Sequence, residues 1–259
     1  MDMRETGIDS GWRPVIRFAA ISAIVVTAMI PLQAAIFLLW PPPTTTLGYF
    51  ALFADHPLLG LLDLDLLLTI DYLLMIPLYI ALFAVVERTS RGWALVALVV
   101  GLLSLGLFFV SREATFSMWQ LSSQYAVADH AADRAALTAS AQTLLTLYTG
   151  GTFGLSYLLG AASTLIFSIV MVRRRIFGRL PGAVGIATGV TMLVPANVGT
   201  VGVVVAMLSL IPTAWWLILL SRSFFRLLRT STTHNRRQQI LGTTTRVPGD
   251  RPPRVQSRP

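Results

Sequence analysis

Asp71 is the residue of this chain best placed to do chemistry, because it lies inside a long apolar run, DLDLLLTIDYLLMIPLYI. A carboxyl group within hydrocarbon is costly and needs a partner, water or a proton. Pro77 follows on the same run and has no N–H, so it leaves the carbonyl of Leu73 without its helical donor. Asp71 and Pro77 could together form a proton or cation site. Alternatively, Asp71 is a structural carboxyl bonded to a Ser or Thr of another span, and Pro77 only kinks its helix.

Asp63 and Asp65 lie just before this run. On a helix Asp65 points away from Asp63 and Asp71, so the three carboxylates do not form one ligand face. We expect Asp63 and Asp65 to mark the water boundary at the outer mouth of the span. Acids at the start of a helix also suit the positive end of its dipole, so a structural role is favoured for both.

Asp129 and Asp133 are spaced one helical turn apart, with His130 between them. Two carboxylates at this spacing can hold a divalent cation. The pair stands alone and Arg134 follows it, so a solvated helix start with Asp129 as the cap is favoured. The chain has no cysteine, which excludes disulfides and Cys-ligated zinc. We therefore predict no metal site, no cofactor and no catalytic residue.

The elements that must position these residues are long apolar helices. Hydrophobic residues make up 54% of the chain and charged residues 12%, about half the charged share of a soluble domain. Segments of about 20 apolar residues can cross a bilayer core. The sequence thus predicts an all-α, polytopic transmembrane bundle of six spans over residues 18–229. The spans are expected at about residues 18–40, 64–86, 93–110, 152–172, 180–195 and 200–220, of which the fifth is short and rich in glycine.

The distribution of arginine predicts the orientation of this bundle. All 20 basic residues are arginine, and 18 of them lie in the N-terminal tail (residues 1–17), after spans two and four, or after span six. Only Arg112 and Arg134 fall in the other gaps. Because basic residues tend to stay in the cytoplasm, both termini are predicted to be cytoplasmic, N-in and C-in.

The segments outside the spans are small. The largest outer element covers residues 111–151, and its Ala- and Leu-rich stretch from Asp129 to Tyr148 is predicted to be a helix. Residues 230–259 are basic and poor in apolar side chains, so they are predicted to be a disordered cytoplasmic tail. Arg222, Arg226 and Arg229 recur every three or four residues after span six, where anionic lipid headgroups are their expected partners. Because the membrane accounts for the basic residues, nucleic-acid binding is not expected.

Small residues recur at four-residue spacing in the later spans, for example Gly185 with Gly189 and Gly202 with Ala206. Such spacing lets helices approach closely. It could form the face of a homo-oligomer or receive a protein partner, although packing between spans of one chain explains the same pattern and is favoured.

Four segments of the chain resemble a group of small bacterial six-span membrane proteins that are classified as a domain of unknown function. They read DYLLMIPLYIALFAVVERTS, FSMWQLSSQYAVADHAADRAALTASAQTLLTLY, SYLLGAASTLIFSIVMVRRRIFGRLPGAVGI and SLIPTAWWLILLSRSFFRL. The resemblance covers about residues 18–228 and rests on the order of the elements. It implies six helices in a bacterial inner membrane, and it brings no activity, cofactor or catalytic residue with it.

Three functional hypotheses fit these observations. The first is a non-enzymatic membrane protein that acts as an accessory, sensor or assembly factor, and it is favoured because it needs only packing surfaces. The second is a small ion- or proton-coupled carrier that uses Asp71 next to a Pro77 kink, although six short spans offer little material for a substrate site. The third is an intramembrane enzyme acting on a lipid or isoprenoid, with Asp71 as general acid. No second acid or base is evident beside Asp71.

Overall fold

The computed structural model describes residues 10–195 and 199–244, and within these residues all regular structure is helical. A short 3-10 turn (Ser10–Trp12) leads into the first helix. The α-helices are α1 (Arg13–Leu39), α2 (Thr46–Asp55), α3 (Pro57–Asp63), α4 (Leu66–Ser111), α5 (Glu113–Val127), α6 (Ala131–Thr149), α7 (Gly151–Arg174), α8 (Leu180–Thr191) and α9 (Gly199–Thr244).

Proline sets both ends of α1. Pro14 occupies the first turn, where a missing N–H costs nothing and the fixed φ suits a helix start. The helix ends at Leu39, just before Pro41–Pro43, because prolines disfavour the helical conformation of the residues that precede them.

Helix α4 is a helical hairpin. Its backbone leaves the helical region at Ser90 (φ −159°, ψ 72°), which divides it into a first arm, residues 66–89, and a second arm, residues 91–111. Tyr72 stacks on Phe108, and Tyr79 lies against Gly101, which is the pairing that an antiparallel hairpin centred on Ser90 requires. The arms are joined at Thr89-Ser90-Arg91-Gly92, in which Thr, Ser and especially Gly have low helix propensity.

Pro77, where the sequence suggested a kink, lies inside α4 and does not end the helix. Ser90 is the residue with non-helical φ and ψ within α4, whereas Pro77 lies inside the first arm. Leu78 and Tyr79, which follow Pro77, are 1% and 3% exposed, so packing on both sides holds this part of the helix in place.

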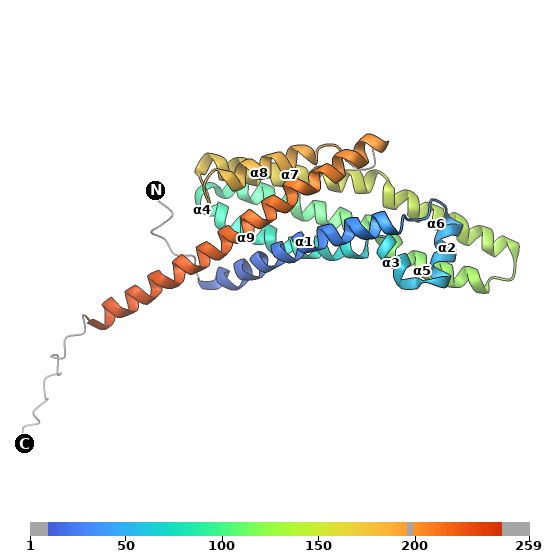
Figure 1. The fold of residues 1–259 in the computed structure, drawn as a ribbon, viewed down its shortest axis with the longest axis horizontal. Helices are drawn as coiled ribbons and strands as arrows, with labels where there is room; N and C mark the ends of the chain where they lie inside the picture. Colours follow the sequence, from blue (N-terminus) through green and yellow to red (C-terminus); the bar gives the residue numbers. More distant parts are fainter. Residues whose placement is uncertain (1–9, 196–198, 245–259) are drawn as a thin grey trace, which may run out of the picture.

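Helices α1, α4, α7, α8 and α9 form a bundle with one continuous apolar core (Figure 1). Small residues let these helices approach one another closely. Gly101 lies against Ser163 of α7, whose hydroxyl donates to the carbonyl of Ala97 at 2.7 Å. Gly185 and Gly189 face α7 in the same way, as does Gly182. The small-residue spacing of α8 therefore serves contact between helices of one chain, as the favoured interpretation predicted.

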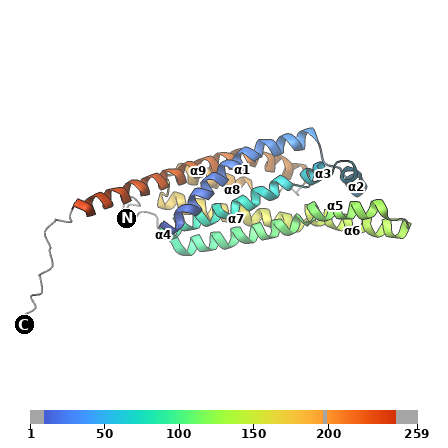
Figure 2. The same cartoon turned by 90° about the horizontal axis from the view of Figure 1, so that it is seen from below.

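Helices α2, α3, α5 and α6 form a second body, which we call the helical lobe, at one end of the bundle (Figure 2). It has a core of its own, in which Tyr49, Phe50 and Phe53 of α2 pack with Met118 of α5. Two polar contacts reinforce it. The hydroxyl of Ser122 donates to the carbonyl of Phe50 at 2.9 Å, and the hydroxyl of Thr46 donates to Oε1 of Gln142 at 2.9 Å.

Four segments of the described chain are long and apolar enough to cross a membrane: Arg13–Phe37, Leu66–Val127, Ala131–Arg174 and Gly199–Thr230. The second of them contains the bend at Ser90. Helix α8 is apolar but has only 12 residues, or about 18 Å at the usual rise, less than a bilayer core of about 30 Å. Every predicted span thus coincides with a helix or with one arm of α4.

The helix predicted for residues 129–148 is confirmed as α6, which begins two residues later than expected, at Ala131. At the other end of the chain, α9 continues to Thr244, in place of the disorder predicted from residue 230. No proline occurs between Pro212 and Pro248, so no strong breaker ends the helix where the apolar residues run out. Residues 1–9 and 245–259, which belong to the predicted tails, lie outside the described residues.

Candidate functional site

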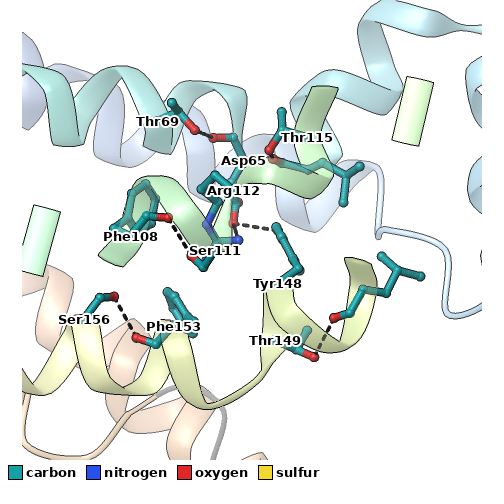
Figure 3. A network of polar contacts seen from close by, with 12 residues as sticks. Asp65, Thr69, Phe108, Ser111, Arg112, Thr115, Tyr148, Thr149, Phe153 and Ser156 are labelled. Atoms are coloured by element: carbon teal, nitrogen blue, oxygen red, sulfur yellow. Dashed lines mark hydrogen bonds and ion pairs between the residues drawn. The ribbon is translucent and has the colours of Figure 1, made fainter. Parts of the chain in front are cut away.

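A buried ion pair joins the two ends of the α4 hairpin (Figure 3). Asp65 precedes the first arm and Arg112 follows the second, and Nη1 of Arg112 lies 2.8 Å from Oδ2 of Asp65. The Arg112 side chain is only 3% exposed and that of Asp65 is 35% exposed. The pair closes the open end of the hairpin, at the junction with the helical lobe.

Tyr148 of α6 completes this cluster. Its hydroxyl donates to the same Oδ2 of Asp65 at 2.6 Å. The guanidinium carbon of Arg112 lies 4.0 Å from the centre of the Tyr148 ring, 4.6 Å from that of Phe153 and 4.8 Å from that of Phe108. Such cation–π contacts stabilise a desolvated guanidinium by roughly 2 kcal/mol or more. Arg112 is thus held by three aromatic rings and one carboxylate.

The backbone places Asp65 for this contact. Asp65 adopts a left-handed conformation (φ 62°, ψ 35°), which Asp tolerates better than most residues. The preceding residue, Leu64, is fully buried, and its carbonyl accepts a hydrogen bond from the Thr115 hydroxyl of α5. The carbonyl of Asp65 itself accepts from the Thr69 hydroxyl at 2.9 Å. Helices α3, α4 and α5 therefore meet at this turn.

Breaking a buried ion pair by removing one partner typically costs about 3–5 kcal/mol, because the other charge is left uncompensated. The Asp65–Arg112 pair therefore favours one orientation of the lobe on the bundle. Nε of Arg112 is buried without a hydrogen-bond partner among the described residues. The free-energy cost of removing this N–H from water is therefore not offset by a hydrogen bond.

Asp63 lies beside this cluster, at the end of α3 rather than at the start of a membrane helix. Burial, and next the nearby charge of Asp65, raise the pKa of Asp63 to about 6. Burial, followed by the charges of Asp63 and Asp65, raises the pKa of Tyr49 to about 12. Of the two acids expected at the outer mouth, only Asp65 stands immediately before α4. Its side chain pairs with Arg112 and does not cap the helix.

Asp71 is 5% exposed, and its partner is an amide of α1 rather than the Ser or Thr that the sequence suggested. Nε2 of Gln33 donates to Oδ2 of Asp71 at 2.5 Å. Oδ1 of Asp71 is buried and has no hydrogen-bond partner among the described residues. Pro77 lies six residues further along the same arm, within the helix.

The other candidate residues are placed on surfaces. His130, not Asp129, is the residue before α6, and Asp133 lies in its first turn. In the described part of the chain, no three His, Cys, Asp or Glu side chains come together as a metal site would require. Arg222, Arg226 and Arg229 are exposed on α9.

Sequence reasoning missed Arg112, Tyr148 and Gln33 as members of polar sites. Arg112 did carry a signal, because it is one of the two arginines that fall in gaps where the predicted topology expects none. A basic residue that departs from the topological pattern needs a local partner. Gln33 is likewise the one amide side chain in the first apolar run.

Comparison with known families matches residues 18–221 to one described as Domain of unknown function (DUF4386). No curated protein and no solved structure matches the chain.

Proposed function

The chain belongs to the DUF4386 family, and from that premise we propose that it is a non-enzymatic integral membrane protein, an accessory or assembly factor, that presents its helical lobe to a protein partner. The proposed bundle crosses a bacterial inner membrane six times, with both termini in the cytoplasm and the lobe on the outer side. The Asp65–Arg112 pair is the observation that carries this proposal.

The bend at Ser90 supports the proposed number of spans, because it lets the candidate segment Leu66–Val127 cross the membrane twice. Helix α8 supplies the fifth crossing. Because it is short, the bilayer thins locally or flanking residues reach into the interface. The start of α1, the connection between α7 and α8, and the basic continuation of α9 lie at one end of the molecule, opposite the lobe (Figures 1 and 2). These are the arginine-rich segments, which favours that end as the cytoplasmic one.

A fixed lobe favours partner binding over catalysis. Three groups of the Arg112 cluster come from three places in the chain, the start of α4, its end, and α6, so the lobe is held in one orientation. A preorganised surface loses less conformational freedom when it binds. Two shallow hollows on the molecule, along residues 13–21 and residues 99–107, include none of Asp63, Asp65 and Asp71.

The lobe also displays aromatic side chains. Phe116 and Trp119 of α5 are 54% and 46% exposed, and they lie one helical turn apart on the same face. Exposed aromatic residues on a rigid helix are typical anchors of protein interfaces. We take this face of α5 as the first surface to test.

A photo-crosslinking amino acid placed at Trp119 tests the proposal in living cells. The matched control is the same substitution at Trp93, which is 60% exposed but lies near the bend of α4, at the other end of the bundle. We expect a protein adduct of one defined mass from position 119 and none of that mass from position 93.

Adding Arg112→Gln to the Trp119 probe should weaken the adduct, because the lobe loses its fixed orientation. If position 119 yields only lipid adducts, or the same adducts as position 93, the lobe is not a partner-binding surface and the proposed function is wrong.

A further inference from the structure

We propose that Asp71 and Gln33 form a proton-binding site inside the membrane bundle, with the proton on Oδ1 of Asp71. Asp71 is 95% withdrawn from solvent, and one of its two oxygens, Oδ2, accepts the hydrogen bond from Nε2 of Gln33. The other oxygen is buried and has no partner among the described residues. This inference does not depend on the function proposed for the lobe.

The location of Asp71 removes the usual ways to stabilise a carboxylate. It lies about 9 Å along the helix from Asp65, at a rise of 1.5 Å per residue, and so on the membrane side of the Arg112 cluster. An ionised carboxylate in an apolar medium is far more costly than a neutral acid unless a cation or several donors accompany it. One amide N–H is the only donor that the described residues provide to Asp71.

The elements packed against the first arm of α4 bring no counter-charge to Asp71. Helix α1 has no charged residue after Arg17, and neither do residues 92–111 of the second arm or residues 151–172 of α7. Arg112 follows the second arm, and its carboxylate partner is Asp65. The titratable groups nearer to Asp71 include Asp63 of α3, the Asp65–Arg112–Tyr148 cluster, Tyr157 of α7, and Tyr72 and Tyr79 of α4 itself. Glu87, Arg88 and Arg91 at the bend lie about 24 Å or more along the helix from Asp71, and Arg17 lies about 24 Å along α1 from Gln33.

A proton on Oδ1 removes the cost of a buried charge that has no counter-ion. It neutralises the carboxyl group and leaves Oδ2 as the acceptor for Gln33, so the observed hydrogen bond is kept. The ligand of the site is therefore a proton, and its exchange would change the charge at the contact between α1 and α4 without any ion pair being made or broken.

Dicyclohexylcarbodiimide, an apolar reagent that reacts with protonated carboxyl groups in membranes, tests this assignment. The full chain in lipid vesicles is treated over a range of pH, and adducts are located by mass spectrometry of peptides. We expect an adduct on Asp71 that declines as the pH rises. Asp71→Asn should abolish that adduct, whereas Asp63→Asn, which changes a carboxyl outside the apolar segment, should leave it unchanged.

Gln33→Leu provides the more specific readout. The substitution removes the amide N–H that donates to Asp71 and favours the ionised carboxylate. The pH at which labelling of Asp71 falls should therefore move up by about one unit. A purely structural role for Gln33 would alter stability without moving this midpoint in that direction.

Two results would overturn the proposal, and both use the wild-type chain, so neither depends on whether a variant folds. Absence of the Asp71 adduct at acidic pH means that the carboxyl group is not protonated. Suppression of the adduct by Na⁺ or K⁺ at constant pH means that a metal cation occupies the site.

Discussion

Asp65 and Arg112 are 47 residues apart in the chain, yet their side chains meet at 2.8 Å because they precede and follow the same helical hairpin. The contact closes the end of the hairpin that faces the helical lobe, and the Tyr148 hydroxyl binds the same carboxylate oxygen. One buried arginine thus contacts the turn before α4 and the helices α4, α6 and α7. The arrangement makes the orientation of the lobe depend on a few polar atoms.

Arg112→Gln should lower the free energy of unfolding by about 3 kcal/mol, because Asp65 loses its charged partner and three aromatic rings lose theirs. The value is placed at the lower end of the usual range because 35% of the Asp65 side chain remains exposed to solvent. Unfolding in mixed micelles by a denaturing detergent measures the change.

Arg134→Gln is the control for Arg112→Gln. Arg134 also belongs to the lobe, but its Nε donates to the carbonyl of Ala128 on an exposed part of α6. Its substitution should cost less than about 1 kcal/mol. Equal costs for the two variants would show that burial of Arg112 does not govern the stability of the lobe.

Asp63 should make stability depend on pH. Its pKa is raised in the folded state from 3.8 to about 6, first by burial and then by Asp65, so the folded chain holds this proton more tightly than the unfolded chain. The resulting stabilisation is fully present below about pH 4 and is lost as the pH rises through about 6. The melting temperature of the wild type relative to Asp63→Asn should therefore fall across this window and become constant above it.

An exposed acid of the same lobe, changed in Asp133→Asn, serves as the control for the pH experiment. A difference between wild type and Asp63→Asn that stays constant, or rises with pH, contradicts the assigned direction of the Asp63 pKa.

The orientation of the bundle can be measured by cysteine accessibility, because the chain has no cysteine of its own. Ser140 is exposed on α6 and Thr230 is exposed on the continuation of α9, so the two variants are Ser140→Cys and Thr230→Cys. A membrane-impermeant maleimide added to intact spheroplasts should label position 140 and not position 230. After the membrane is permeabilised, both should react. Labelling of position 140 from the cytoplasmic side alone would reverse the proposed topology.

Much of the helical architecture could be predicted from the sequence, because each helix of the bundle is an apolar run with arginine at one end at least. The position of the α4 bend could not, since Pro77 is the stronger local signal and yet its neighbours pack tightly enough to keep the helix continuous. Helices α2 and α3 also went unassigned. They are short, and their helical structure depends on packing against Met118 of α5 rather than on a hydrophobic periodicity within each segment.

The polar sites were only half predictable. Asp65 and Asp71 stand out in the sequence because carboxylates are rare near apolar runs. Their partners, Arg112 and Gln33, lie 47 and 38 residues away, and nothing local connects them. Which acid meets which donor is decided by the hairpin and by the contact between α1 and α4, and these are properties of the folded chain.

The glycines of the bundle are not equivalent, and a matched pair of substitutions separates them. A Cβ atom on Gly182 of α8 would lie 2.6 Å from Cγ2 of Val172 and 2.9 Å from the carbonyl oxygen of Ser168, so Gly182→Ala must push α8 away from α7. We expect a loss of about 1–3 kcal/mol, as in other overpacked cores. A Cβ atom on Gly106 of α4 would meet nothing within 4 Å, so Gly106→Ala should stabilise its helix by about 0.5–1 kcal/mol. The same detergent unfolding experiment compares both. If the two variants change stability in the same direction, close packing of α8 on α7 does not explain why the fifth apolar segment is rich in glycine.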